Sequence, residues 1–466
     1  MQNDWSPTSW QNKLSVQQPT YADKDVLNKV LKQLSRLPPL VTSWEVKALK
    51  KQLAEATREK SFLLQGGDCS ESFEDCESSR IASTLKILLQ MCLILMHGSK
   101  KRVIRVGRFA GQYAKPRSAN METRDGVTLP SYRGDMINGI KFTEADRVPK
   151  PERLLRGYER AALTLNFIRS LVDGGFADLH HAEYWNMRFV KQSPQAREYQ
   201  RIVKNIGESI KFMETITNAP IGEINRLDFY SSHEGLHLLY EQAQTRQVPH
   251  SPGWYNLSTH FPWIGDRTRA LDGAHVEYFR GIENPIGVKI GPTITPDELI
   301  ALTEILNPRN EAGRLTLIYR FGVNKIIDHL PPLIRAVKKA GRVVLWCCDP
   351  MHGNSEITSE GIKTRNFENI LGELEQAFEI HHEESSYLGG VHFELTGDNV
   401  TECIGGIRGI TEKNLTEAYK TQVDPRLNYE QSLEMALLVA RRMGKMKEGL
   451  EKDSKLLPAT AFHVQV

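Results

Sequence analysis

Apolar runs that end abruptly in polar loops recur along this chain, and they predict its strands. In GRVVLWCCDPMHGNS (341–355), valine, leucine and aromatic residues give way to a loop that carries Asp349, His352 and Asn354. A short continuous apolar run is typical of a strand buried on both faces of a parallel sheet. Seven further segments are predicted to contain strands, at residues 61–68, 101–112, 227–234, 256–269, 284–292, 313–322 and 389–397.

Helical patterns occupy most of the intervals between these strands. The helix after the fifth strand opens with Thr295 and Pro296 and has acidic residues in its first turn, as expected at a helix N-terminus. Eight strands with helices between them predict an α/β fold, a single (β/α)8 TIM barrel. The other clear helices are predicted at residues 24–36, 43–59, 79–96, 151–172, 195–216 and 429–443.

The barrel is predicted to occupy residues 56–466, after an N-terminal extension over residues 1–55. The extension carries two tryptophans in a polar stretch and is interrupted by a Pro-Pro pair. Such a segment is more often a packing or subunit-contact element than a site, so a role in assembly or regulation is expected. The interval 147–225 is too long for one crossover helix, and an inserted helical pair is expected there.

Composition argues against several classes of protein. The chain has 466 residues, a quarter of them charged, with a formal net charge of only +3 and no lysine or arginine tract. Nucleic-acid and membrane-surface roles therefore have little support. No apolar run is judged to approach the roughly 20 residues that span a bilayer, and the N-terminus does not resemble a secretory signal. The six cysteines are too few for a disulfide framework, which favours a reducing cytoplasm.

Four potential metal ligands follow or end predicted strands. Cys69 follows the first strand, His352 the seventh, Glu394 lies near the end of the eighth, and Asp424 comes later. In a closed barrel the eighth strand pairs with the first and the seventh, so most of these side chains would meet at one sector of the rim. Each alone has an ordinary explanation, but a thiolate, an imidazole and two carboxylates together suit Mn, Fe, Co or Zn. The other cysteines are interpreted as packing residues: Cys76, Cys92, Cys347, Cys348 and Cys403.

Basic residues form a second group. Lys289 is the most informative, because GVKIG places an ammonium inside an otherwise apolar strand. It either pairs with a carboxylate inside the barrel or, with other cations, binds an anionic ligand. Lys115 and Arg117 in KPRS would extend the surface toward a second anion. A reaction between two acidic, phosphorylated small molecules is therefore predicted. The cations at the ends of other strands are Arg108, Arg267 and Arg320.

From about residue 61 to 440 the chain resembles the type II family of 3-deoxy-D-arabino-heptulosonate 7-phosphate (DAHP) synthases. The matching segments are FLLQGGDCSESF, GQYAKPRS, SYRGDMING, SHEGL, WIGDRTR, DGAHVEYFRGIENPIGVKIGP, GRLTLIYRFG, DPMHGN, ELTGDNVTEC and DPRLN. They are long, varied and in the family's order, and SWQNK–QQPTY resembles its N-terminal extension. The resemblance implies a transferase that condenses phosphoenolpyruvate with erythrose 4-phosphate and water, the first step of the shikimate pathway.

The resemblance also implies roles for individual residues. The implied metal ligands are Cys69, His352, Glu394 and Asp424. The implied phosphoenolpyruvate-binding residues are Arg108, Trp263, Asp266, Arg267, Lys289 and Arg320. The implied erythrose 4-phosphate motif is Lys115, Pro116, Arg117 and Ser118. Mn or Co is the expected ion, with Zn, Fe or Cd as alternatives. A cytoplasmic homo-oligomer, dimer or tetramer, is expected, with an aromatic amino acid as candidate effector. The implied catalytic residues are Lys289, Cys69 and His352.

Some positions depart from the family pattern. Asp266 stands where members usually have Glu, and Val423 where some have Cys, which removes a potential disulfide partner for Cys69. The lead-in HHEESSYLGG is also unusual. Two alternative functions stay open: an aldolase of the same fold in which Lys289 forms a Schiff base, and a non-catalytic regulatory paralogue.

Overall fold

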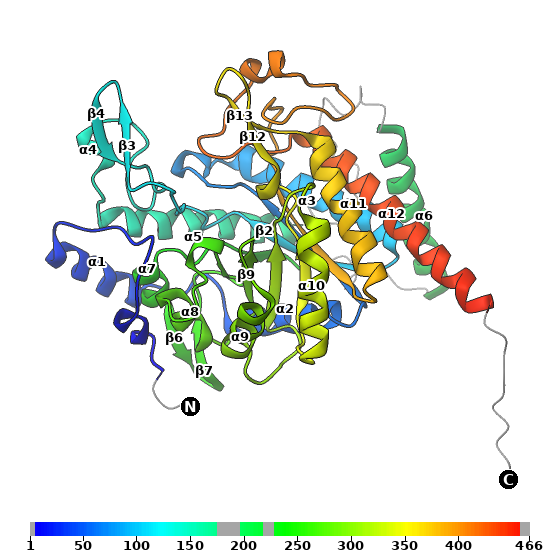
Figure 1. The fold of residues 1–466 in the computed structure, drawn as a ribbon, viewed down its shortest axis with the longest axis horizontal. Helices are drawn as coiled ribbons and strands as arrows, with labels where there is room; N and C mark the ends of the chain where they lie inside the picture. The colour runs from blue at the N-terminus through cyan, green and yellow to red at the C-terminus, as the bar shows by residue number, and fades with distance from the viewer. Residues whose placement is uncertain (1–4, 175–195, 218–227, 457–466) are drawn as a thin grey trace, which may run out of the picture.

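The computed structural model describes residues 5–174, 196–217 and 228–456, and its centre is a closed parallel barrel (Figure 1). The sheet order is β5-β2-β1-β14-β11-β10-β9-β8. The two ends of this order join through backbone hydrogen bonds from Phe261 N to Ser231 O (3.2 Å) and from Trp263 N to His233 O (3.1 Å). The predicted (β/α)8 barrel is therefore confirmed. Its strands are β1 (Ser61–Gly67), β2 (Arg102–Arg108), β5 (Tyr230–Ser231), β8 (Trp263–Ile264), β9 (Ile286–Ile290), β10 (Leu315–Tyr319), β11 (Leu345–Cys348) and β14 (Leu388–Glu394).

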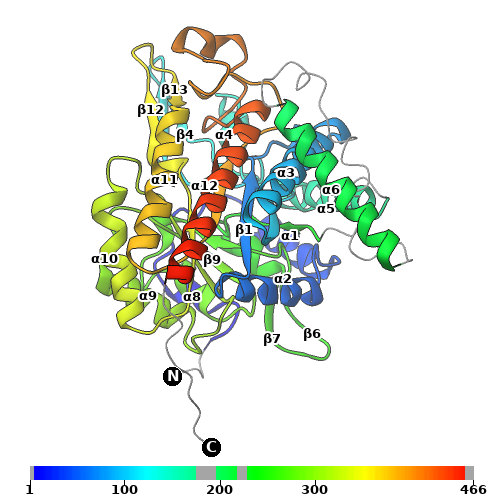
Figure 2. The ribbon, with the colours of Figure 1, turned by 90° about the vertical axis from the view of Figure 1, so that its right-hand side faces the viewer.

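Helices surround the barrel, and Figure 2 shows α10, α11, α12 and α3 standing side by side outside it. Two long helices, α5 and α6, fall in the interval where an inserted pair was expected; residues 175–195 and 218–227 of that interval lie outside the described ranges. The barrel helices are α3 (Ser78–Ser99), α7 (Leu238–Ala243), α8 (Ala274–Arg280), α9 (Pro296–Leu306), α10 (Ile326–Lys339), α11 (Phe367–Glu383) and α12 (Tyr429–Leu456). The others are α1 (Lys24–Arg36), α2 (Ser43–Ala56), α4 (Glu144–Arg147), α5 (Glu152–Asp173) and α6 (Ala196–Thr217).

The expectation that no apolar run is long enough to cross a membrane is wrong for α3. This helix has 22 residues and a mean hydropathy of 1.6 in its most apolar window, which meets the length and composition of a membrane span. Most of that window, 61%, is buried inside the protein. The helix packs against α12 and β2, so its apolar character is accounted for by contacts on several sides within the core.

Helix α2 fills the amino-terminal end of the barrel. It begins with a capping box, in which Thr42 Oγ1 accepts from Glu45 N (3.3 Å) and Glu45 Oε2 accepts from Thr42 N (2.8 Å). Its Leu49, Leu53 and Ala56 are fully buried in one cluster with inward-facing side chains of the barrel strands. Figure 2 shows α2 lying across the lower end, below β1. The predicted boundary after residue 55 would therefore leave almost all of helix α2, which completes the barrel core, outside the barrel domain.

Three short antiparallel hairpins were not predicted. Their strands are three to six residues long, and most of their residues are exposed or half-buried, so they lack the apolar runs used to find the barrel strands. The first had a usable local signal, because its turn is Asp125–Gly126 with φ of +48° and +79°, the conformation that Asp-Gly favours. The hairpins are β3 (Met121–Arg124) with β4 (Val127–Pro130), β6 (Thr245–Val248) with β7 (Ser251–Asn256), and β12 (Ser355–Ile357) with β13 (Lys363–Arg365).

Candidate active site

The loops at the carboxyl ends of the barrel strands enclose a cavity of about 470 Å³. This volume lies in the usual range for small-molecule sites. Among the described residues, its walls carry seven cationic side chains and four carboxylates. Of the site residues predicted from the sequence, Glu394 is the one that does not line the cavity. Its side chain is fully buried behind the cavity wall. The predicted residues that line the cavity are Cys69, Arg108, Lys115, Pro116, Arg117, Ser118, Trp263, Asp266, Arg267, Lys289, Arg320, His352 and Asp424.

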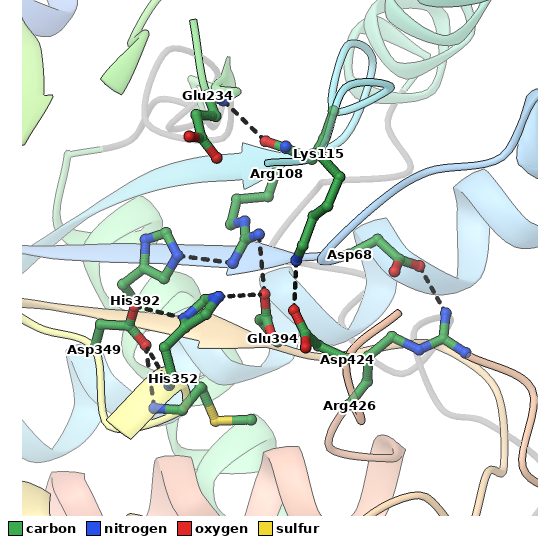
Figure 3. A network of polar contacts seen from close by, with 12 residues as sticks. Asp68, Arg108, Lys115, Glu234, Asp349, His352, His392, Glu394, Asp424 and Arg426 are labelled. Atoms are coloured by element: carbon green, nitrogen blue, oxygen red, sulfur yellow. Dashed lines mark hydrogen bonds and ion pairs between the residues drawn. The ribbon is translucent and has the colours of Figure 1, made fainter. Parts of the chain in front are cut away.

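The four expected metal ligands converge at one side of this cavity, and Figure 3 shows three of them, His352, Glu394 and Asp424. The donor atoms of Cys69, Glu394 and Asp424 all lie within 4.8 Å of one another. His352 Nε2 lies 3.0 Å from Glu394 Oε1, which brings the imidazole to the edge of the same cluster. The reason is strand order: β1 pairs with β14 and β14 with β11, as predicted, so the ends of these three strands are neighbours.

Asp349, at the end of β11, fixes the orientation of His352. Its Oδ2 lies 2.7 Å from His352 Nδ1, which turns Nε2 toward Glu394. The backbone N–H groups of Met351 and His352 donate to Asp349 Oδ1 at 3.1 and 3.3 Å. Asp349 is fully buried; burial opposes ionisation, but His352 and Lys289 outweigh it and hold the pKa of Asp349 well below its usual value.

Cations compensate the carboxylates of the cluster. Lys115 Nζ lies 2.5 Å from Asp424 Oδ2, and Lys363 Nζ lies 2.5 Å from Asp424 Oδ1. Burial alone would lower the pKa of Lys115, but the nearby carboxylates raise it above its usual value. Cys69 is fully enclosed, and burial raises the pKa of its thiol to about 12. A thiolate there therefore needs a further positive charge, such as a bound cation.

Lys289 satisfies both interpretations that the sequence left open. Its Nζ pairs with the buried carboxylate of Asp349, and the same side chain lines the cavity. Burial, together with the charge of Arg108, lowers the pKa of Lys289 to about 8, although Asp349 opposes the shift. Asp349 thus connects the lysine to the imidazole of His352, and a substrate held by Lys289 would lie next to the metal-ligand cluster.

Arg108 is held from three sides, and Figure 3 shows two of these contacts, those to His392 and Glu394. Its Nη1 lies 2.7 Å from His392 Nε2, its Nη2 lies 3.2 Å from Glu394 Oε1, and its guanidinium lies 5.2 Å from the ring centre of Trp263. His392 Nδ1 in turn lies 2.7 Å from Gln65 Oε1. Because Gln65 Oε1 can only accept, His392 carries its proton on Nδ1 and accepts from Arg108 through Nε2. Burial and the neighbouring cations Lys289 and Arg108 hold the pKa of His392 well below its usual value.

Asp266, which stands where family members usually have the longer Glu, pairs with cations on the opposite wall of the cavity. Its Oδ1 accepts from Gly291 N and from Arg269 Nε, both at 3.0 Å, and its Oδ2 accepts from Arg320 Nη1 at 3.5 Å. The neighbouring Arg267 donates from Nη2 to Ser118 Oγ at 3.1 Å. The loop after β8 therefore touches both the Arg320 side of the cavity and the KPRS loop.

Sequence reasoning missed several residues of the site. Glu234 lines the cavity; its Oε1 has no hydrogen-bond partner among the described residues, and burial raises its pKa despite nearby cations. His392 had a signal, because it alternates with Glu394 in β14 and so points to the same face. Lys363 and Arg365 lie on β13, and Arg365 Nη1 reaches Glu394 Oε2 at 2.7 Å. Nothing local marks them, since only the folded hairpin carries them to the rim.

The fold and the site define a (β/α)8 barrel with a deep, cation-lined cavity at its carboxyl rim, beside a mixed thiol, imidazole and carboxylate cluster. Residues 5–440 match the class-II DAHP synthetase family. The chain belongs to this family, as the sequence motifs predicted.

Curated relatives support the same assignment over almost the whole chain. A Neurospora crassa protein named phospho-2-dehydro-3-deoxyheptonate aldolase is 46% identical, covering 97% of this chain and 98% of its own length. A Streptomyces coelicolor protein of the same name is also 46% identical, with coverage of 93% and 96%. Phospho-2-dehydro-3-deoxyheptonate aldolase AroG of Mycolicibacterium smegmatis is 44% identical, with coverage of 92% and 93%.

A solved structure of a truncated 3-deoxy-D-arabino-heptulosonate 7-phosphate synthase from Thermotoga maritima aligns with 84% of this chain and 88% of that chain. Its sequence identity is 13% and its TM-score is 0.32. That likeness is too low to bear on the fold, which the strand pairing itself establishes.

Proposed function

We propose that this protein condenses phosphoenolpyruvate with D-erythrose 4-phosphate and water to give DAHP and inorganic phosphate, the first step of the shikimate pathway. The observation that carries the proposal is one cavity in which seven cations face a thiol, imidazole and carboxylate cluster. The names of the relatives and the family membership support the same reaction. The cations are Arg108, Lys115, Arg117, Arg267, Lys289, Arg320 and Lys363.

The reaction forms one carbon–carbon bond and breaks one bond to phosphate. The methylene carbon of phosphoenolpyruvate attacks the aldehyde carbon, water adds to the neighbouring enol carbon, and the resulting hemiketal phosphate loses inorganic phosphate to leave a ketone. Arg108, Lys289 and Arg320 bind the carboxylate and phosphate of phosphoenolpyruvate. Arg267, expected at the phosphoenolpyruvate site, lies beside Ser118, and Arg117 and Ser118 bind the phosphate of the aldose. Fixing both anionic ends brings the reacting carbons together and removes most of the entropy cost of their meeting.

Glu234 is suited to handle the proton of the attacking water. Glu234 lines the cavity, its buried Oε1 has no hydrogen-bond partner among the described residues, and its raised pKa moves it toward the range in which a general base works at neutral pH. Four cations, Lys115, Lys289, Arg108 and Arg267, act on its charge. A carboxylate among phosphate-binding cations repels a phosphate group and attracts water, so we assign it to the water rather than to either substrate.

We further propose that Cys69, His352, Glu394 and Asp424 hold a divalent ion, most simply Mn or Co. The donor set fits such an ion, because one soft and three borderline or hard ligands already lie within ion-binding reach of one another. Asp349 would keep His352 oriented with Nε2 toward the ion, as carboxylate partners of ligating histidines do. When bound, the ion supplies Lewis-acid polarisation of the aldehyde oxygen.

The test of this proposal is phosphate and DAHP formation from the two substrates with and without a chelator. We expect the chelated protein to be inactive and Mn²⁺ or Co²⁺ to restore activity. Cys69→Ser should lower metal content and activity together by at least about tenfold, since a hydroxyl is a weaker ligand than a thiolate. Cys76→Ser is the matched control, because Cys76 donates to Arg160 O away from the cluster. Full activity of metal-free protein would contradict the metal proposal.

We also propose that residues 1–55 contribute to assembly of a cytoplasmic homo-oligomer or to its regulation by an aromatic amino acid. The supporting observation is that this segment presents large apolar side chains to solvent: Leu14 is 72% exposed and Trp44 is 75% exposed. The double substitution Leu14→Ser and Trp44→Ser should reduce the mass measured by light scattering while the metal content stays the same. An unchanged mass and effector response would leave the segment a packing element only.

A further inference from the structure

A turn of the N-terminal extension lies against the backbone of the KPRS loop. The side-chain amide of Gln17 pairs with Arg117 in both directions: Gln17 Oε1 accepts from Arg117 N at 2.9 Å, and Gln17 Nε2 donates to Arg117 O at 3.0 Å. This two-way pairing is the pattern that two residues of adjacent β-strands make with each other. A residue 100 positions away in sequence therefore holds both backbone polar groups of Arg117.

Arg133 extends the same contact to the rest of the loop. Its Nη1 donates to Gln17 Oε1 at 3.3 Å, and its Nη2 donates to Asn120 Oδ1 at 2.5 Å. Its backbone carbonyl accepts from Lys115 N at 2.8 Å. Arg133 is 8% exposed, so this guanidinium is a buried support and not a surface charge. Gln17 and Arg133 together contact the KPRS segment at Lys115, at Arg117 and, just after the motif, at Asn120.

The backbone of Gln17 is held in an unfavourable conformation. Its φ is +64°, a left-handed value that glycine and asparagine adopt readily but glutamine does not. The neighbouring residues hold it there: Gln18 Nε2 donates to Leu236 O at 2.7 Å, Gln18 Oε1 accepts from Leu238 N at 3.0 Å, and Leu14 O accepts from Ala274 N at 3.0 Å. Backbone strain of this kind persists at sites where the surroundings require it. At Gln17 the requirement is that the side-chain amide reach the backbone of Arg117.

We infer that Gln17 is a positioning residue for the aldose phosphate: its amide fixes the backbone of Arg117 and so sets the direction in which Arg117 and Ser118 face the cavity. The inference rests on the proposed function, in which KPRS binds erythrose 4-phosphate. Gln17 does not line the cavity, so it acts through the loop and touches neither substrate. The N-terminal extension is then part of the substrate site as well as a packing arm.

The decisive variant is Gln17→Gly, because glycine keeps the left-handed backbone without steric cost and removes the side chain that carries the amide. We expect the KM for erythrose 4-phosphate to rise by about tenfold, as expected for loss of two hydrogen bonds. The KM for phosphoenolpyruvate, the bound metal and the thermal midpoint should stay near their wild-type values. In hydrogen-exchange mass spectrometry the peptide containing Arg117 should exchange faster. Gln11→Ala is the control, since Gln11 Nε2 donates to Gln242 Oε1 at 3.0 Å on the same segment, away from the loop; it should change none of these.

The outcomes separate this inference from the proposed function. Wild-type protein that forms DAHP, with a Gln17→Gly variant unchanged in both KM and exchange at Arg117, would overturn the positioning role alone. A variant whose KM values rise equally for both substrates, or whose melting temperature falls, would show a general structural role and also overturn it. Wild-type protein that forms no DAHP would instead remove the proposed function, and with it the substrate that this inference names.

Discussion

At the scale of single residues, the site is organised by carboxylates that each serve two partners. Asp349 connects Lys289 to His352, and Glu394 connects His352 to Arg108. Such networks fix side chains that are otherwise flexible, because every buried charge has a specific neighbour. Removing one member leaves its partner buried and unpaired, which is costly. Single substitutions in this network should therefore change the affinity for substrate and the affinity for metal by different, measurable factors.

Lys289 distinguishes the proposed mechanism from a Schiff-base aldolase. A nucleophilic lysine must be neutral. The pKa of about 8 leaves Lys289 mostly charged at pH 7, and the buried carboxylate of Asp349 and an incoming dianion both favour the ammonium. We expect borohydride during turnover to leave Lys289 unmodified. Lys289→Arg should lose more than about a hundredfold in activity with metal retained, because a forked guanidinium does not fit an ammonium site.

Exposed Lys24 supplies the control for this test, and Lys24→Arg should be fully active. Peptide mass analysis after borohydride treatment gives the direct readout. A reduced substrate adduct on Lys289 would establish the aldolase reaction and exclude the mechanism proposed for this cavity.

Arg117 tests which wall of the cavity holds the aldose phosphate. Arg117→Ala should raise the KM for erythrose 4-phosphate far more than that for phosphoenolpyruvate. Loss of a charged hydrogen-bonded contact costs roughly 2–5 kcal/mol, so an increase of at least about tenfold is expected in steady-state assays. Arg124→Ala on the nearby β3–β4 hairpin is the control, because Arg124 pairs with Glu122 at an exposed position. Equal effects on both substrates would assign Arg117 to another role.

At the scale of elements, α11 links two loops of the candidate site. Its buried Glu373 accepts from Phe321 N (3.0 Å) and Gly322 N (2.9 Å) through Oε1, and from Asn354 Nδ2 (2.7 Å) through Oε2. Phe321 and Gly322 follow Arg320, and Asn354 lies two residues after His352. One carboxyl group on a helix thus links the loop of the expected phosphoenolpyruvate site to the loop of the expected metal site.

This link gives a pH-dependent prediction for stability. Burial raises the pKa of Glu373 to about 8, above the value of about 4.3 in an unfolded chain. The folded state therefore binds the proton more tightly, and the contribution of this group to stability falls as pH rises from about 4.3 to 8. Relative to Glu373→Gln, which cannot ionise, the wild-type melting temperature should fall by about a degree or more between pH 6 and pH 8.5. A difference that is constant or grows with pH would show that hydrogen bonds to the carboxylate outweigh burial.

At the scale of the whole molecule, the barrel is complete only with α2 in its amino-terminal end. Leu49, Leu53 and Ala56 cover inward-facing residues such as Leu63 and Ile104. The amino-terminal end of a parallel barrel has to be covered, because the barrel interior is filled with apolar side chains while the carboxyl end carries the site. The N-terminal extension therefore contacts both ends of the barrel. Helix α2 fills the amino-terminal end, and Gln17 holds the KPRS loop at the carboxyl end.

Leu53→Ala measures the contribution of this packing. Truncation of a fully buried leucine costs about 2–5 kcal/mol when the cavity cannot collapse, and α2 packs against the barrel strands through Leu49, Leu53 and Ala56. We expect a clear loss of stability in denaturant unfolding, with the KM values of the folded protein unchanged. Leu163→Ala on α5, at a position 55% exposed, is the control. Equal stability of the two variants would mean that α2 is not part of the core.

The amino-acid sequence by itself determined the barrel and the composition of its rim. Continuous apolar runs mark strands buried on both faces, and polar residues directly after them must lie at the carboxyl ends, where parallel strands bring them together. That argument located Cys69, His352 and Glu394 at adjacent strands before any contact was known. The same argument placed the predicted cations together, because a charged side chain at the end of a buried apolar strand can reach solvent only at the rim of the barrel.

Only the tertiary structure decided which of these groups contact one another and what supports them. The partner of Lys289 is Asp349, those of Asp424 are Lys115 and Lys363, and that of Arg117 is Gln17. The paired residues are separated by tens to hundreds of positions, so no local periodicity records them. Short hairpins and the strained turn at Gln17 carry no apolar signal either. The hairpins are held by hydrogen bonds between adjacent strands and the turn by contacts with distant residues, and neither depends on burial of a repeating face.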